Sequence, residues 1–154
     1  MAKISIEDIR KLREMTGVGL TDAKLALVKA NGDFDKALAS MREKGLTKAE
    51  KRAEREARSG LIASYVHDGR IGVLVEVNCE TDFVAKTAEF QELVKDICLH
   101  TAASDAENVE SLLTQPFVKN PDQTLSDYIK EFIAKLGENI VVRRFERYIL
   151  GEVE

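Results

Sequence analysis

The stretch "RIGVLVEVNCETDFVA" (residues 70–85) carries the pattern on which the fold prediction depends. Its first half alternates apolar with other side chains, which is the period of a β-strand with one buried face. The apolar positions are Ile71, Val73, Val75 and Val77. The second half predicts a polar turn before a helical pattern that begins at residue 87. Phe83 is a large apolar side chain inside that polar turn, and its position needs an explanation.

Strand patterns and helical patterns surround this stretch. A second alternating run precedes it and is joined to it by Asp68-Gly69, a dipeptide typical of two-residue hairpin loops because both turn positions need a positive φ. Two amphipathic helical patterns follow (87–102 and 124–136), and the β-branched and aromatic run "NIVVRRFERYIL" (139–150) comes last. This segregation predicts an α+β fold, in which helices cover a small antiparallel three-stranded sheet.

Residues 1–46 predict a separate module of three short helices. Ser5 and Asp8 resemble a capping pair, Gly17 ends the first helix, and "NGD" (31–33) separates the second helix from the third. We expect Gly45 to end the third helix. Three helices in about 45 residues form a minimal hydrophobic core, so the module should be only marginally stable alone.

Residues 47–59 contain the charged run "TKAEKRAEREAR", which predicts an exposed helix that connects the module to residues 60–154. A solvated connecting helix is the ordinary interpretation, and a contact with nucleic acid or the ribosome is the alternative. Residues 1–58 hold 14 Lys and Arg against 10 Asp and Glu, whereas residues 59–154 hold 9 against 17. The acidic balance of the second part argues against nucleic acid as a direct partner.

The composition indicates a globular protein that does not cross a membrane. Hydrophobic residues make up 44 % of the 154 residues and charged residues 32 %, and no stretch approaches the roughly 18 apolar residues that a membrane helix needs. The N-terminal residues lack the apolar segment of a secretory signal. Two cysteines are too few for a disulfide framework, so we expect a reducing, cytoplasmic location.

Enzymatic and metal-binding interpretations have little support in the pattern. A cysteine enzyme would use Cys79 as nucleophile, His67 or His100 as base and Asp82 to orient the base, but only the residue types suggest this. A zinc ion bound by Cys79, Cys98 and the two histidines would lack any CxxC or HxxxH spacing. We therefore expect a binding protein that needs no cofactor and is not an enzyme.

Two interpretations of Phe83 remain open on these grounds. Phe83 and Val84 can fold back under the next helix as part of the core, since phenylalanine is usually buried. Alternatively, Phe83 is an aromatic anchor on a turn with the Asp82 carboxylate beside it, which is the composition of an interface hot spot.

The motifs, taken together, resemble the bacterial-type translation elongation factor Ts family. "NCETDFVA" (78–85) is similar to that family's signature. "IRKLREMTGVGLTDAKLAL" (9–27) and "ANGDFDKAL" (30–38) resemble its N-terminal module, a three-helix fold like ubiquitin-associated (UBA) domains. "QPFV" (115–118) and "GENIVVRRF" (137–145) resemble its closing segments. The similarity extends nearly from end to end and in the same order.

The resemblance implies that this chain is a guanine nucleotide exchange factor. The family's partner is elongation factor Tu, a GTPase from which the family releases GDP. Carried onto this sequence, the resemblance implies that Asp82 and Phe83 enter the partner's GTPase domain beside its magnesium and phosphate region. Thr81 and Val84 would shape the turn, and Lys24 of the UBA-like module would face the same domain. A scaffold or adaptor without exchange activity is the alternative, and the TDF motif favours exchange over it.

The chain also departs from the longer members of the family it resembles. Those members carry two related half-cores and often a helical hairpin inserted between the core helices. Here residues 60–154 hold one half-core, and about a dozen residues, "SDAENVESLLTQ" (104–115), bridge its two helices. A small sheet with long apolar strands has edges and one face that must be covered. We expect a second copy to cover them, which makes a homodimer through the sheet region; a monomer is the alternative.

Overall fold

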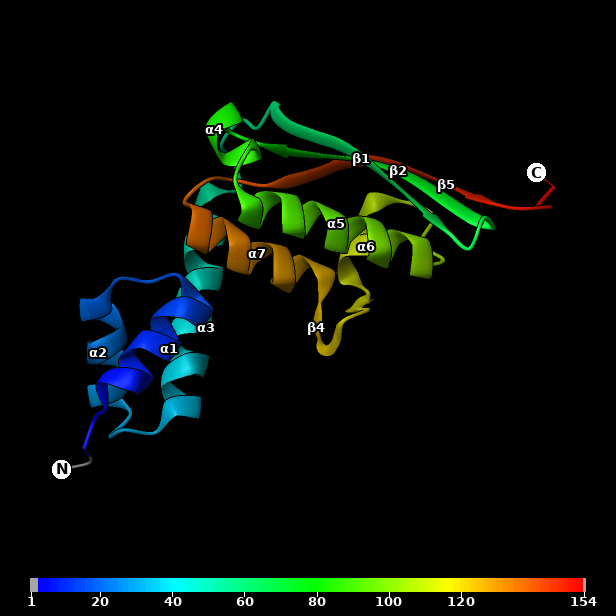
Figure 1. Cartoon of the computed structure of the whole chain (residues 1–154). Coiled ribbons are helices and arrows are strands. Elements are labelled where there is room, and N and C mark those ends of the chain that lie inside the picture. Colours follow the sequence, from blue (N-terminus) through cyan, green and yellow to red (C-terminus); the bar gives the residue numbers. More distant parts are fainter. Residues whose placement is uncertain (1–2, 154) are drawn as a thin grey trace.

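A computed structural model describes residues 3–153 of the chain (Figure 1). Three antiparallel strands form a sheet in the order β1-β2-β5: β1 (Ser59–His67), β2 (Ile71–Cys79) and β5 (Val141–Ile149). Two long helices lie on one side of this sheet: α5 (Ala88–Ala103), which packs directly on β1 and β2, and α7 (Leu125–Leu136), which packs against α5. The predicted α+β fold with a helix-covered three-stranded sheet is confirmed.

The alternation along β2 separates a core face from an outer face, as predicted. Val73, Val75 and Val77 are buried, whereas Leu74 between them is exposed. The turn that joins β1 to β2 has positive φ angles of 53° at Asp68 and 65° at Gly69, so the hairpin signal in the sequence is confirmed.

The main hydrophobic core lies between the sheet and the helices. The predicted apolar face of α5 is buried in it: Phe90, Leu93, Val94, Ile97, Cys98 and Thr101. A stacked pair of rings, Phe117 and Tyr128, with centroids 4.2 Å apart, extends this core toward α7. The Tyr128 hydroxyl donates to the buried carboxylate of Asp96 at 2.5 Å.

Two elements were not expected between α5 and α7. The bridge contains a short helix, α6 (Val109–Thr114), and the segment 116–124 forms a small hairpin of β3 (Pro116–Phe117) and β4 (Asn120–Thr124). Local and tertiary contacts explain both elements. Asn108 caps α6 by accepting from the amide of Ser111, and Leu112 and Phe117 are buried, so apolar side chains fix a segment that looks polar overall.

The N-terminal module consists of three helices: α1 (Ile6–Thr16), α2 (Leu20–Lys29) and α3 (Phe34–Arg52). The Ser5 hydroxyl accepts from the amide of Asp8 at 3.0 Å, and Gly17 ends α1 with a left-handed φ of 70°. Six buried residues form its hydrophobic cluster: Leu12, Ala23, Ala26, Leu27, Ala37 and Met41. Figure 1 shows this module at one end of the molecule, away from the β1–β2 turn.

The prediction that Gly45 ends the third helix is wrong, and so is the prediction of a separate helix over 47–58. Helix α3 continues through Gly45 to Arg52, and residues 53–58 are not helical. Tertiary contacts with α7 explain the continuation. A Cβ at Gly45 would lie 3.3 Å from the Cβ of Ala134, so the small residue allows close helix packing. The Arg52 guanidinium also donates to the carbonyl of Ile133 at 3.0 Å.

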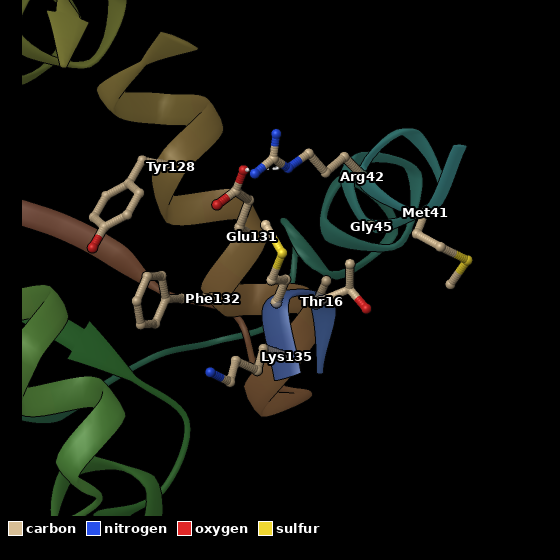
Figure 2. Close-up of a pocket in the computed structure, with 10 residues that line it drawn as sticks. Thr16, Met41, Arg42, Gly45, Tyr128, Glu131, Phe132 and Lys135 are labelled. Atoms are coloured by element: carbon tan, nitrogen blue, oxygen red, sulfur yellow. Dashed lines mark ion pairs between the residues drawn. The ribbon is translucent and has the colours of Figure 1, made fainter. Parts of the chain in front are cut away.

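A cavity of about 220 Å³ lies at the junction between the module and α7. Figure 2 shows Arg42 of α3 and Glu131 of α7 side by side among the residues that line it, with 3.6 Å between the guanidinium and the carboxylate. Burial raises the pKa of the Glu131 carboxyl, and the nearby Arg42 charge opposes that shift. Helix α3 therefore connects the module to the core through both close packing and an ion pair.

Candidate partner-binding site

The turn singled out by the sequence lies where β2 ends and a short helix, α4 (Asp82–Ala85), begins. We call residues 81–84 the TDF turn. Thr81 is the N-cap of α4, and its hydroxyl oxygen accepts from the amide of Val84 at 3.3 Å. The Cys79 thiol at the end of β2 donates to the carbonyl of Thr81 at 3.2 Å. The strand end and the cap together set the direction of the turn.

Neighbouring side chains of the TDF turn have opposite environments. Phe83 is 82 % exposed, whereas Val84 is 6 % exposed and packs in the main core. Thr81 and Asp82 are also exposed. The interpretation of Phe83 as a core residue is therefore wrong, although the same interpretation is right for Val84. Val84 attaches the turn to the core, and Asp82 and Phe83 are presented to solvent.

A second loop, which follows α7, supports the TDF turn through the carboxylate of Glu138. Its Oε1 accepts from the backbone amides of Glu80 at 3.1 Å and Thr81 at 3.0 Å, and its Oε2 accepts from the Thr81 hydroxyl at 2.7 Å. These partners are 57 or 58 residues apart in the sequence. One side chain therefore holds three donors at the start of the turn.

Glu80 provides a second contact between the TDF turn and the loop after α7. Its carboxylate accepts from the amide of Asn139 at 2.9 Å and lies 3.8 Å from the guanidinium of Arg55. The Asn139 side chain in turn donates to the carbonyls of Ala53 and Arg55. The TDF turn, the loop after α7 and the segment after α3 therefore share one hydrogen-bond network.

Lys24 lies in a different unit from the turn. Its side chain is exposed on α2 of the module, and the structure does not bring it into the TDF turn. Leu20, Leu25 and Val28 on the same helix are exposed as well. The module thus presents an apolar surface with a lysine on it, separate from the aromatic turn of the core.

The residues of the alternative cysteine enzyme do not come together. In the β1–β2 register, Cys79 lies opposite Ser59, eight residues along β1 from His67, a separation of about 26 Å at the rise of a strand. His100 instead accepts from the amide of Val118 through Nδ1 at 3.2 Å. Burial raises the pKa of both cysteine thiols to about 11, so neither is an activated nucleophile.

Among residues 3–153, no three His, Cys, Asp or Glu side chains are grouped so that they could hold a metal ion. In that same range, no helix has both the length and the apolar character needed to span a bilayer.

Known proteins share extended sequence similarity with this chain. The family described as "Elongation factor TS" matches residues 80–153, from the TDF turn to the end of β5 and beyond. The Elongation factor Ts of Caldanaerobacter subterraneus subsp. tengcongensis is 41 % identical, and the match covers 97 % of this chain and 98 % of that protein. This chain belongs to the elongation factor Ts family. Its role is accordingly that of a translation elongation factor in protein biosynthesis.

Other members of the elongation factor Ts family match over similar lengths. That of Moorella thermoacetica is 43 % identical, and the match covers 97 % of this chain and 96 % of that protein. That of Thermodesulfovibrio yellowstonii is 37 % identical, and the match covers 98 % of each chain. Each alignment extends over 195 positions, more than the 154 residues of this chain. These relatives therefore carry residues that have no counterpart here.

Glu138 and Asn139 were not predicted as parts of the site. Both lie in "GENIVVRRF", one of the segments in which the family resemblance was seen, and that was the only signal available. Nothing in the spacing showed that this segment meets the TDF turn, because the contact depends on how α7 packs.

Proposed function

We propose that this chain is a guanine nucleotide exchange factor that promotes release of GDP from elongation factor Tu in the cytoplasm. The observation that carries the proposal is Phe83, an aromatic side chain 82 % exposed on a hydrogen-bonded turn. A large apolar side chain presented in this way is typical of an interface anchor. Membership of the elongation factor Ts family supports elongation factor Tu as the partner.

The proposed mechanism follows from thermodynamic linkage. GDP with Mg²⁺ stabilises one arrangement of the partner's phosphate-binding region, and this chain binds another, so each must weaken the other by the same factor. Mg²⁺ neutralises charge on the diphosphate, and disturbing its coordination removes much of what holds GDP. No covalent bond changes, and the final nucleotide equilibrium stays the same.

Within this mechanism the residues of the TDF turn have different tasks. Phe83 inserts its ring into the partner's GTPase domain, and Asp82 places a carboxylate beside the partner's magnesium and phosphate region. Thr81 caps α4 and Val84 packs in the core, so both hold Phe83 in place. Lys24 on the exposed face of α2 contacts the same domain from the module.

Release of a fluorescent GDP analogue from purified elongation factor Tu tests the function. Addition of this chain should raise the release rate in proportion to its concentration until the partner is saturated. Binding to elongation factor Tu without a change in the release rate would contradict the proposal and would instead support an adaptor.

We also propose that the active form is a homodimer joined through the outer face of the sheet. Three elements contribute exposed apolar side chains to this face: Ile62 and Val66 of β1, Leu74 of β2 and Tyr148 of β5. Arg144 and Glu146 of β5 point to the same face, because they lie opposite Glu76 and Leu74 in the register. A second copy related by a two-fold axis offers both apolar area and opposite charges to this face.

Sedimentation equilibrium at micromolar concentration tests the dimer. The chain mass is 17.2 kDa, so a species of twice that mass supports the proposal and a single species at the chain mass contradicts it. Leu74→Asp should dissociate the dimer. Leu25→Asp is a matched control, because Leu25 is 51 % exposed and Leu74 is 52 % exposed, but Leu25 lies on the module and its substitution should leave the mass unchanged.

A further inference from the structure

The loop after α7 contains a residue that acts on the TDF turn without being part of it. Gly137 ends α7 with a φ of 78°, and this sharp exit brings Glu138 to the start of the turn. The Glu138 carboxylate accepts three hydrogen bonds there, at 3.1, 3.0 and 2.7 Å, from the amide of Glu80 and the amide and hydroxyl of Thr81. Hydrogen bonds to an ionised acceptor are stronger than those between neutral groups.

The bond to the Thr81 hydroxyl has a consequence for α4. A threonine hydroxyl has one proton to donate and lone pairs with which to accept. Because its proton is directed to Glu138, a lone pair of Oγ1 is left to accept from the amide of Val84. Glu138 therefore orients the cap of α4, and α4 carries Phe83.

The hydrogen bond between Glu80 and Asn139 restrains the position of Glu138. The carboxylate of Glu80 accepts from the amide of Asn139, so the backbone next to Glu138 is bonded to the residue before Thr81. The Asn139 side chain also holds the segment after α3 through the carbonyls of Ala53 and Arg55. Rigid support of this kind keeps a functional side chain close to its productive geometry.

We propose that Glu138 is a positioning residue for nucleotide exchange, which acts by holding the TDF turn so that Phe83 enters the partner. This inference rests on the proposed function. Loss of the Glu138 carboxylate leaves Phe83 exposed but lets the turn sample other orientations. The maximal rate of GDP release at saturating concentration should therefore fall more than the affinity for the partner.

The first test uses the free protein and needs no partner. Glu138→Ala should speed hydrogen exchange at the amides of Glu80 and Thr81 by about tenfold or more, the size expected when a bond to a charged acceptor is lost. Glu107→Ala is the matched control, because Glu107 is an exposed glutamate in the loop before α6. Unchanged exchange at both amides in Glu138→Ala would overturn the proposal.

The second test measures GDP release from elongation factor Tu over a range of chain concentrations. Glu138→Ala should lower the maximal rate about tenfold and change the half-saturating concentration by less than about threefold, since the anchor itself is retained. Glu138→Gln keeps one acceptor oxygen for the two amides, but its NH2 group cannot accept from the Thr81 hydroxyl, so this variant should recover only part of the rate. A purely structural loss would instead lower the folded fraction and would not separate these two parameters.

A double variant separates failure of the inference from failure of the proposed function. If Glu138 acts through Phe83, Glu138→Ala should cause no further loss in a chain that already carries Phe83→Ala. If Phe83→Ala slows GDP release and Glu138→Ala does not, only the proposed role of Glu138 is overturned. Full activity of both single variants would overturn the proposed role of the turn and, with it, that of Glu138.

Discussion

The N-terminal module and the α+β core carry the two surfaces proposed for partner contact, but they hold them in different ways. Among the described residues, the core has a cluster of twenty buried residues and the module a cluster of six. The TDF turn is attached to the large cluster through Val84 and bonded to a second loop through Glu138. The module is held by its own small cluster and by its junction with α7. We therefore expect the core to supply precise geometry and the module to supply additional binding surface.

The largest expected effect tests whether the module is the weaker unit. Leu27 in the module and Ile97 in the core are both fully buried, and truncation of either to alanine should cost about 2–5 kcal/mol. Leu27→Ala should unfold the module, because so small a cluster has little stability to lose. Ile97→Ala should leave the core folded but less stable. Hydrogen exchange of the amides in α1–α3 measures the result, and retained protection in Leu27→Ala would contradict the comparison.

A smaller loss of stability is expected when the close contact between the module and α7 is disturbed. Gly17 and Gly69 both have a left-handed φ, 70° and 65°, but a Cβ would meet the Lys135 side chain at 2.5 Å at Gly17 and open space at Gly69. Gly69→Ala should cost about 1–2 kcal/mol from the backbone conformation alone. Gly17→Ala should cost more, because it also forces Lys135 away. Urea unfolding compares the two variants, and equal costs would show that this close contact does not support the junction.

A pH dependence should appear in the core through His100. Burial lowers the pKa of His100 below its usual value, so between that lowered pKa and about 6.5 the unfolded chain binds a proton that the folded chain does not. The free energy of unfolding should therefore fall as the pH drops through this window. His100→Gln should remove this part of the dependence, and His67→Gln at the exposed histidine should keep it. Parallel stability curves for the wild type and His100→Gln would contradict the prediction.

The smallest effect is expected from the two cysteines. Both thiols are buried, and their raised pKa keeps them protonated at neutral pH. The Cys79→Ser, Cys98→Ala double variant should promote GDP release within about twofold of the wild type, since neither thiol is reactive. Serine at position 79 can still donate to the carbonyl of Thr81. Loss of exchange in a folded double variant would revive the enzymatic interpretation.

Local signals in the sequence predicted much of the fold. The alternation along residues 71–77, the Asp68-Gly69 turn and the glycine that ends α1 each act within a few residues, so a pattern or a cap is enough to identify them. The exposure of Phe83 was among the interpretations, but composition alone did not choose it. That choice required the packing of the next residue, Val84, into the core.

The features that the sequence did not reveal depend on residues far apart in the chain. Gly45 is a helix terminator by propensity, yet the contact with Ala134 makes it an interior residue of α3. The bonds from Glu138 to residues 80 and 81 form only after α7 has packed beside the sheet. Contacts of this kind leave no periodic pattern in the sequence. Glu138 and Asn139 were therefore missed, although the exposed residues Asp82 and Phe83 were predicted.

Phe83 and Val84 are neighbours in the chain but differ in exposure, so their alanine variants separate a role in exchange from a role in stability. Phe83→Ala should change the free energy of unfolding by no more than about 0.5 kcal/mol, because its side chain is exposed, and should lower the maximal rate of GDP release from elongation factor Tu about tenfold or more. Val84→Ala should cost about 1–3 kcal/mol of stability, because its side chain is buried. A Phe83→Ala chain that unfolds easily, while its folded fraction releases GDP at the normal rate, would contradict the account.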